Sequence, residues 1–185
     1  MRFEIQDTPL PDLKVLQRKP IGDSRGYFER MFCVEELNDL LKHRMVLQIN
    51  HTLTQHKGTV RGLHFQNPPH VELKFVNCLK GEVFDVAVDL RPDSPTFLKW
   101  YAEYLSDSNW KTLVVPEGFA HGFQTLTDNC ELLYFHTATY NAAAEGGLNA
   151  LDERLGITWP LSITEQSSRD QNHPMIDSMF KGVTS

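Results

Sequence analysis

The stretch Arg61-Gly62-Leu63-His64-Phe65-Gln66-Asn67-Pro68-Pro69 leads into Lys74 and brings an arginine, a histidine and a lysine within fourteen residues. Segments rich in β-branched and aromatic residues lie on both sides of it. Ionisable side chains beside such segments predict a polar site set into a sheet. Histidine side chains titrate near neutral pH, so His64 is a candidate for chemistry, although a lone histidine is also common in ordinary cores.

Length and composition are those of an ordinary folded protein. The chain has 185 residues, 41% hydrophobic and 23% charged, which predicts one domain, 1–185, with a real core. The net charge of −6 argues against a nucleic-acid partner, whereas a local basic pocket for a phosphorylated ligand stays possible. The start, MRFEIQDTPLPDL, has no apolar run and predicts no signal peptide, and no run of about 18 apolar residues predicts a membrane helix.

The three cysteines point to a reducing compartment. Cys33, Cys78 and Cys130 are far apart and form no Cys-x-x-Cys pair. This spacing predicts neither a disulfide framework nor a zinc site, and it favours a cytoplasmic location.

The first half of the chain predicts extended segments and one helix. Residues 3–20 are extended and broken by prolines, and residues 22–26 have the composition of a turn. Residues 27–32 alternate as a strand does, and residues 35–42 predict a short helix with leucines on one face. A further strand is predicted over 46–51.

Short strands dominate the rest. Residues 74–79 and 82–90 predict a hairpin around Lys80-Gly81. Asp85 and Asp89 share a face of the second strand with Val83 and Ala87, which fits either a polar barrel interior or a wet outer face. The later strands are predicted at 100–105, 112–115, 122–126 and 132–139.

After Tyr140 the composition changes. Residues 142–147 predict a loop, residues 157–160 an apolar anchor, and residues 162–169 a weak helix. Helical segments are few and no βαβ alternation occurs, which predicts an all-β antiparallel sandwich or barrel.

A second motif, Pro116-Glu117-Gly118-Phe119-Ala120-His121, delivers a histidine from a turn. It resembles the second motif of the cupins, which are double-sheet jelly rolls. Metal-binding cupins also need a His-x-His motif followed by Glu, and here that position is His64-Phe65-Gln66. With one ligand missing, a metal-dependent cupin enzyme is the less favoured alternative.

Together the segments resemble the family of nucleotide-diphosphate 4-keto-6-deoxysugar epimerases, typified by the dTDP-4-dehydrorhamnose 3,5-epimerases. The matching segments are RGLHFQ at 61–66, GEVFDVAVDLR at 81–91, SPTF at 94–97, VPEGFAHGF at 115–123, LY at 133–134 and GITWP at 156–160. The resemblance implies an all-β, cupin-like jelly roll (a double-stranded β-barrel) with a few short helices. It also implies epimerisation of a nucleotide-linked 4-keto-6-deoxyhexose in deoxysugar biosynthesis for a surface polysaccharide or glycoside.

The resemblance assigns four catalytic residues. Because a ketone acidifies the neighbouring C–H bonds, epimerisation needs a base on one face of the sugar, an acid on the other, and a group that holds the enolate oxygen. His64 is implied as the base, oriented by Asp170; Tyr134 is implied as the acid and Lys74 as the enolate-stabilising cation. No metal and no organic cofactor is implied.

The resemblance also implies the substrate contacts. The candidate binding residues are Arg25, Arg61 and Arg169 for phosphate, Phe28 for stacking on the base, and Gln48, Asn50, His121, Tyr140 and Glu145 for the remaining contacts. The family forms homodimers that exchange N-terminal strands, so Phe28 is expected to serve the partner's site. His51, His56, His70, His136 and His173 receive no role.

One departure concerns the nucleotide. The family carries a carboxylate five residues after the arginine of its Arg-Gly turn, where this chain has Arg30, with Glu29 displaced by one. In a strand, an offset of one residue moves a side chain to the opposite face, so a CDP- or GDP-sugar is an alternative to dTDP unless Arg30 is an inconsequential surface charge.

The motifs do not decide between inversion at carbon 3, carbon 5 or both. A carbon-3 epimerase and a non-catalytic sugar-nucleotide binding protein stay as alternatives.

Overall fold

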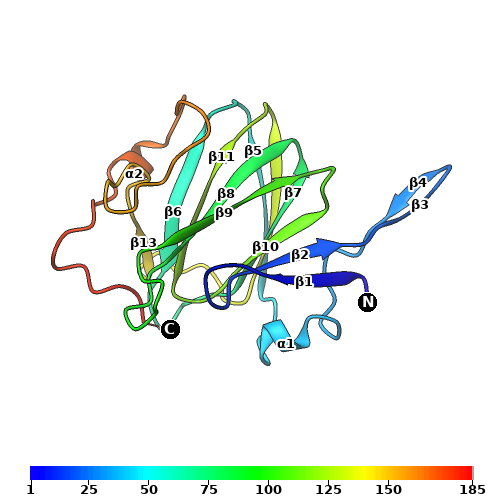
Figure 1. The fold of residues 1–185 in the computed structure, drawn as a ribbon, viewed down its shortest axis with the longest axis horizontal. Helices are drawn as coiled ribbons and strands as arrows, with labels where there is room; N and C mark the ends of the chain where they lie inside the picture. Colours follow the sequence, from blue (N-terminus) through cyan, green and yellow to red (C-terminus); the bar gives the residue numbers. More distant parts are fainter. Residues whose placement is uncertain (185) are drawn as a thin grey trace.

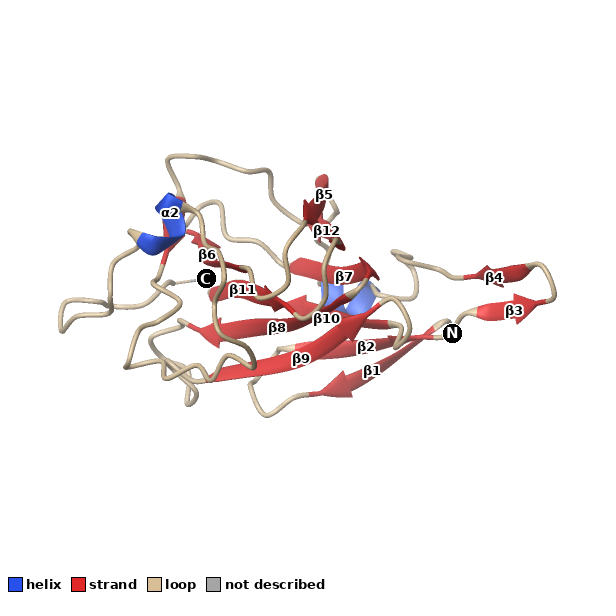
Figure 2. Ribbon diagram, turned by 90° about the horizontal axis from the view of Figure 1, so that it is seen from above, coloured by secondary structure: helices blue, strands red, loops and turns tan. Residues whose placement is uncertain are grey.

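Two antiparallel sheets pack face to face, and a short hairpin projects from one end (Figures 1 and 2). The computed structural model describes residues 1–184. The six-stranded sheet has the order β1 (Phe3–Asp7), β2 (Lys14–Arg18), β10 (Lys111–Val115), β7 (Lys74–Lys80), β12 (Cys130–His136) and β5 (Gln48–Thr54). The five-stranded sheet has the order β13 (Glu145–Gly147), β6 (Val60–Gln66), β11 (Phe119–Thr125), β8 (Glu82–Asp89) and β9 (Trp100–Ser106). This is the jelly roll that the sequence predicted, with two short helices, α1 (Asn38–Leu41) and α2 (Ser168–Gln171).

The inner faces of the sheets share the central core. Val76 and Leu132 from the six-stranded sheet pack with Val83 and Phe123 from the five-stranded sheet. Each strand sends alternate side chains inward, so the period of two in the sequence becomes a core between the layers. Burying one such side chain fully stabilises the fold by roughly 1.5–3 kcal/mol.

Both outer faces are covered as well. Leu37 and Leu41, at α1, pack on Phe75 of the six-stranded sheet. The C-terminal segment covers the five-stranded sheet, where Trp159 packs with Phe84. The predicted apolar anchor at 157–160 is therefore confirmed.

The predicted hairpin of β7 and β8 is wrong. β7 pairs with β10 and β12, whereas β8 pairs with β11 and β9, so the chain crosses from one sheet to the other at Lys80-Gly81. Alternation of residue types identifies the faces of a strand but not its neighbours. Asp85 lies fully buried on the inner face beside Val83 and Ala87, which is the barrel interior and not a wet outer face.

Several predicted boundaries also need correction. The strand over 27–32 shortens to β4 (Gly26–Phe28), which pairs only with β3 (Ile21–Asp23) around the predicted turn. The predicted loop at 142–147 ends in β13, because Glu145–Gly147 pairs with β6. The helix over 162–169 is instead α2, capped by Ser167, and the helix over 35–42 shortens to α1. The strand over 46–51 begins at Gln48 and extends to Thr54.

No helix of the described chain has the length and apolar character needed to span a membrane.

Candidate active site

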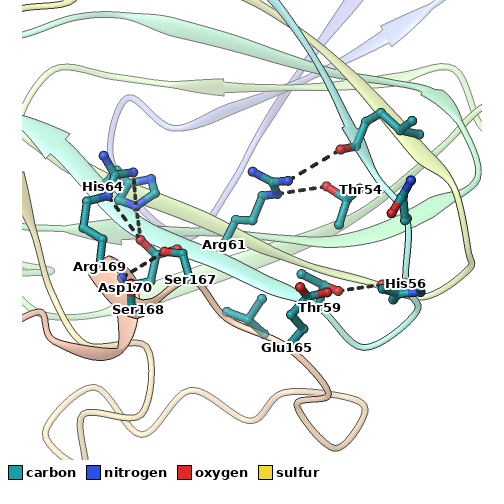
Figure 3. Close-up of a pocket in the computed structure, with 13 residues that line it drawn as sticks. Thr54, His56, Thr59, Arg61, His64, Glu165, Ser167, Ser168, Arg169 and Asp170 are labelled. Atoms are coloured by element: carbon teal, nitrogen blue, oxygen red, sulfur yellow. Dashed lines mark hydrogen bonds and ion pairs between the residues drawn. The ribbon is translucent and has the colours of Figure 1, made fainter.

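His64 and Asp170 form a hydrogen-bonded pair at one end of the barrel (Figure 3). His64 lies on β6, and Asp170 lies in α2, which packs against β6. The Nε2 atom of His64 is 2.8 Å from Oδ1 of Asp170, and the backbone N–H of Gly62 donates to Oδ2 at 3.1 Å. A Cβ at Gly62 would lie 2.6 Å from the Cα of Gly122, so only glycine allows β6 to approach β11 this closely. The structure thus joins two predicted residues that are 106 positions apart.

The Asp170 carboxyl group is ionised near neutral pH. Its burial raises the pKa, but the hydrogen bond and charge of His64 and the Gly62 N–H outweigh burial and hold the pKa at about 2. An ionised carboxylate only accepts hydrogen bonds, so the proton of neutral His64 lies on Nε2 and the lone pair on Nδ1. A carboxylate that fixes the tautomer of a histidine is a recurring arrangement for a general base.

Tyr134 and Lys74 lie on the inner face of the opposite sheet. Tyr134 projects from β12, and its ring centre is 6.3 Å from that of His121 on β11, so the two sheets meet here. Burial raises the pKa of the Tyr134 hydroxyl well above its ordinary value, which keeps the proton in place. The Nζ atom of Lys74, on β7, is 3.3 Å from Oε1 of Glu72. A proton donor and a cation therefore line the six-stranded sheet, opposite the sheet that carries His64.

His121 has its own carboxylate. It stands opposite His64 in the register of β11 and β6, yet its Nε2 atom is 2.8 Å from Oδ1 of Asp85. Complete burial raises the pKa of Asp85 and lowers that of His121, and both directions favour the uncharged forms. His64 and His121, which correspond to the two cupin motifs, therefore bind different carboxylates.

A cavity of about 490 Å³ opens beside the pair and holds two of the three predicted phosphate contacts (Figure 3). Arg61 and Arg169 both line it, and the Nε atom of Arg61 donates to Thr54 at 3.0 Å. Arg169 donates to Glu145 at 3.0 Å, and the hydroxyl of Tyr140 donates to the same carboxylate at 2.9 Å. A much smaller space of about 10 Å³ lies between Lys74, His64 and His121, so His64 borders both.

One row of side chains crosses the six-stranded sheet at this end. His136 on β12 pairs in register with Gln48 on β5 and with Lys74 on β7. Its Nε2 atom is 3.4 Å from Nδ2 of Asn50, and its Nδ1 atom is 2.7 Å from Glu72. Gln48 and Asn50 were predicted here, whereas His136 and Glu72 were missed. The signal was their spacing, since each lies two residues from a predicted catalytic residue, Tyr134 or Lys74.

Arg25 and Phe28 are not brought to this site. Both lie in the β3–β4 hairpin, which points away from the end of the barrel that carries β6 and α2 (Figures 1 and 2). The Arg25 guanidinium pairs with Asp23 at 2.6 Å, and Phe28 is 63% exposed. Of the thirteen predicted site residues, these two alone lie on that hairpin.

Arg30 and Glu29 lie outside the strand. Arg30 pairs with Glu36 at 2.5 Å, and Glu29 pairs with the buried Arg18 at 3.0 Å. Because β4 ends at Phe28, no strand runs through these residues, and the one-residue offset does not turn a carboxylate to the opposite face of a strand.

Known proteins match this architecture along the whole chain. The family model described as dTDP-4-dehydrorhamnose 3,5-epimerase matches residues 7–178. The chain belongs to this family. It is 42% identical to the dTDP-4-dehydrorhamnose 3,5-epimerase of Salmonella typhimurium over 172 residues, which cover 92% of this chain and 93% of the relative.

Solved structures and other relatives agree with membership of the dTDP-4-dehydrorhamnose 3,5-epimerase family. The crystal structure of a dTDP-6-deoxy-D-glucose-3,5-epimerase from Legionella pneumophila, in complex with dTDP-4-keto-L-rhamnose, superposes with a TM-score of 0.91 at 36% identity, covering 99% of each chain. A dTDP-4-dehydrorhamnose 3-epimerase of Streptomyces niveus is 36% identical over 82% of this chain and 73% of its own. The predicted family is confirmed, and the chain is an isomerase that epimerises a nucleotide-linked 4-keto-6-deoxy sugar.

Proposed function

We propose that this enzyme inverts carbons 3 and 5 of a dTDP-linked 4-keto-6-deoxyhexose, in the biosynthesis of a deoxysugar, without a metal or organic cofactor. The observation that carries the proposal is that His64, held by Asp170 at 2.8 Å, lies on one sheet and Tyr134 lies on the sheet that faces it. A base and an acid on opposite walls would act on opposite faces of a sugar ring held between them. Such an arrangement is what inversion requires.

In the proposed reaction, Nδ1 of His64 removes the proton next to the ketone and an enolate forms. The ammonium group of Lys74 stabilises the negative charge that develops on the enolate oxygen. Tyr134 then donates its hydroxyl proton to the opposite face of the same carbon. Asp170 stays ionised throughout and stabilises the imidazolium form of His64.

The proposed nucleotide contacts combine residues of two subunits. Arg61 and Arg169 line the cavity beside His64 and suit the oxygens of a diphosphate. Arg25 and Phe28 would come from the β3–β4 hairpin of a second copy, since they project from their own subunit. Ile21, Tyr27 and Phe28 are 48%, 60% and 63% exposed, which supports a homodimer that covers this hairpin.

The similar proteins from Salmonella typhimurium and Legionella pneumophila are epimerases of dTDP-linked sugars, which favours dTDP as the nucleotide here. Glu29 lies beyond the end of β4, so its displacement by one residue gives no ground for preferring CDP or GDP. A cytoplasmic location, as the cysteine content predicts, stays part of the proposal.

Solvent exchange tests the function. The enzyme is incubated in deuterium oxide with dTDP-, CDP- or GDP-linked 4-keto-6-deoxyglucose, and the ring hydrogens are followed by NMR. We expect deuterium at carbons 3 and 5, fastest with the dTDP sugar. Exchange no faster than in a protein-free control, for all three sugars, would contradict the proposal.

Inversion at carbon 3 alone is the second candidate, because the Streptomyces niveus relative carries the name of a 3-epimerase. The same NMR spectra separate the two functions, since a 3-epimerase would leave the carbon 5 hydrogen in place. A non-catalytic binding protein would bind the sugar and exchange neither hydrogen.

A further inference from the structure

His173 lies beside the His64–Asp170 pair and has no role in the proposed reaction. It follows α2, and its Nε2 atom is 3.7 Å from Oδ1 of Asp170. Its ring centre is 5.7 Å from that of His64, and the two rings are nearly perpendicular. Nε2 is shielded from solvent and has no hydrogen-bond partner among the described residues. A buried ring nitrogen without a partner is uncommon and points toward a ligand.

Gly147 makes the room for this ring. It stands opposite His64 in the register of β13 and β6, and a Cβ there would lie 2.3 Å from Cε1 and Nε2 of His173. Any other residue at this position would therefore push His173 away from His64. Burial, followed by the charge of His64, lowers the pKa of His173, so its ring is neutral near pH 7 and offers a lone pair.

Three donor atoms lie close enough together to share one metal ion. The ring nitrogens of His64 and His173 and an Asp170 carboxylate oxygen all lie within 4.8 Å of one another. Bonds of about 2.0–2.2 Å at tetrahedral angles place zinc ligands roughly 3.4 Å apart, so zinc binding requires the 2.8 Å contact between His64 and Asp170 to lengthen and the 3.7 Å contact between His173 and Asp170 to shorten slightly. Two imidazoles and one carboxylate form a donor set that zinc commonly uses with a fourth position open. Within residues 1–184, no other cluster of three His, Cys, Asp or Glu side chains fits a metal.

One positive charge opposes a cation here. Nη2 of Arg169 is 3.4 Å from Nε2 of His64. The Arg169 side chain is 55% exposed and pairs with Glu145 at 3.0 Å, so zinc binding requires its guanidinium to turn toward solvent. Asp170 supplies one negative charge, which offsets half of the charge of a divalent ion.

We propose that His64, Asp170 and His173 form an inhibitory site for Zn²⁺. The ion binds Nε2 of His64, and the proton of that nitrogen moves through solvent to Nδ1, so the neutral ring keeps one proton. Nδ1 then has no lone pair to take the proton of the sugar. Zinc binding needs only the three ligands, whereas the inhibition also rests on the proposed function of His64.

Zinc binding to the intact, chelator-treated enzyme tests the site without any turnover. Titration with Zn²⁺ in competition with a chromogenic chelator should give one ion per chain. His173→Ala and His173→Gln should bind at least about tenfold more weakly, since only two donors remain. His56→Ala is the matched control, because His56 lines the same cavity but lies outside the ligand set, and it should bind as the wild type does.

Inhibition of turnover by zinc is measured separately from zinc binding. Zinc should inhibit the wild type and His56→Ala at concentrations that leave His173→Ala active, and a chelator should restore the rate. Absence of a stoichiometric zinc ion in the wild type would overturn the proposal, as would wild-type affinity in both folded His173 variants, checked by circular dichroism. Binding that depends on His173, in a protein that turns over no sugar, would support the metal site and reject the proposed function.

Discussion

The imidazole of His64 can act as a base only in the tautomer that leaves Nδ1 free, and a single carboxylate selects that tautomer. Asp170 is 2% exposed and accepts from both His64 and the Gly62 backbone. Its pKa of about 2 means that it is ionised at neutral pH. The residue therefore works through His64, as a positioning group.

Replacing this carboxylate tests that role. Asp170→Asn keeps the shape but lets the amide N–H₂ face Nε2, which favours the wrong tautomer. We expect kcat to fall by about 10²–10⁴-fold, the usual contribution of a positioned base, with the chain still folded. Ser168→Ala, at the same cavity, should stay within a few-fold of the wild type. Near-normal kcat in Asp170→Asn would remove the carboxylate from the mechanism.

The ionised carboxylate of Glu72 is expected to stabilise the folded chain. The charges of Lys74 and His136 overcome burial and hold the pKa of Glu72 at about 2, compared with an ordinary value of 4.5. Because the folded pKa is lowered, the stabilisation is complete above about pH 4.5 and is lost as the pH falls toward 2. Its size at neutral pH is on the order of 3 kcal/mol.

Urea unfolding at several pH values measures the stabilisation that Glu72 provides. Glu72→Gln should be less stable than the wild type at pH 7 and should lose less stability between pH 4.5 and 3. Glu153→Gln, at an exposed position, should follow the wild type. Parallel pH profiles for the wild type and Glu72→Gln would show that the carboxylate adds nothing in the folded state.

At the scale of elements, the sequence predicted the faces of strands better than their partners. The alternation in 82–90 correctly separated Asp85 from Phe84, because a strand has a period of two. It did not show that β7 and β8 belong to different sheets, since pairing depends on contacts across the whole fold. β13 was missed because Gly146 and Gly147 carry no strand signal and pair with β6 only through the backbone.

The β3–β4 hairpin is predicted to contribute Phe28 to the active site of the partner subunit. If Phe28 serves the partner's site, a mixture of Phe28→Ala and His64→Asn chains forms heterodimers with one intact site. Each parent should be impaired, and the mixture should recover activity above the sum of the two after subunit exchange. Activity equal to that sum, in a sample that is dimeric by analytical ultracentrifugation, would place Phe28 in its own subunit's site or in none.

At the scale of the whole molecule, the site exists because the two sheets face each other. Sequence motifs predicted His64, Lys74 and Tyr134, yet only the fold shows that His64 and Tyr134 come from opposite layers. The contacts of Glu72, His136 and His173 could not be predicted from the sequence, because their partners are fixed by strand register and by the path of the C-terminal segment. Arg25 and Phe28 stay predictions that require a second subunit.

In the proposed reaction, inversion needs a base on one sheet and an acid on the other. The most direct measurement follows deuterium incorporation and configuration together, by NMR, in Tyr134→Phe. We predict that this variant still incorporates deuterium next to the ketone, because His64 removes the proton and returns a deuteron to the same face, but without inversion. His64→Asn should do neither. Inversion at the wild-type rate in Tyr134→Phe, or exchange in His64→Asn, would contradict the account.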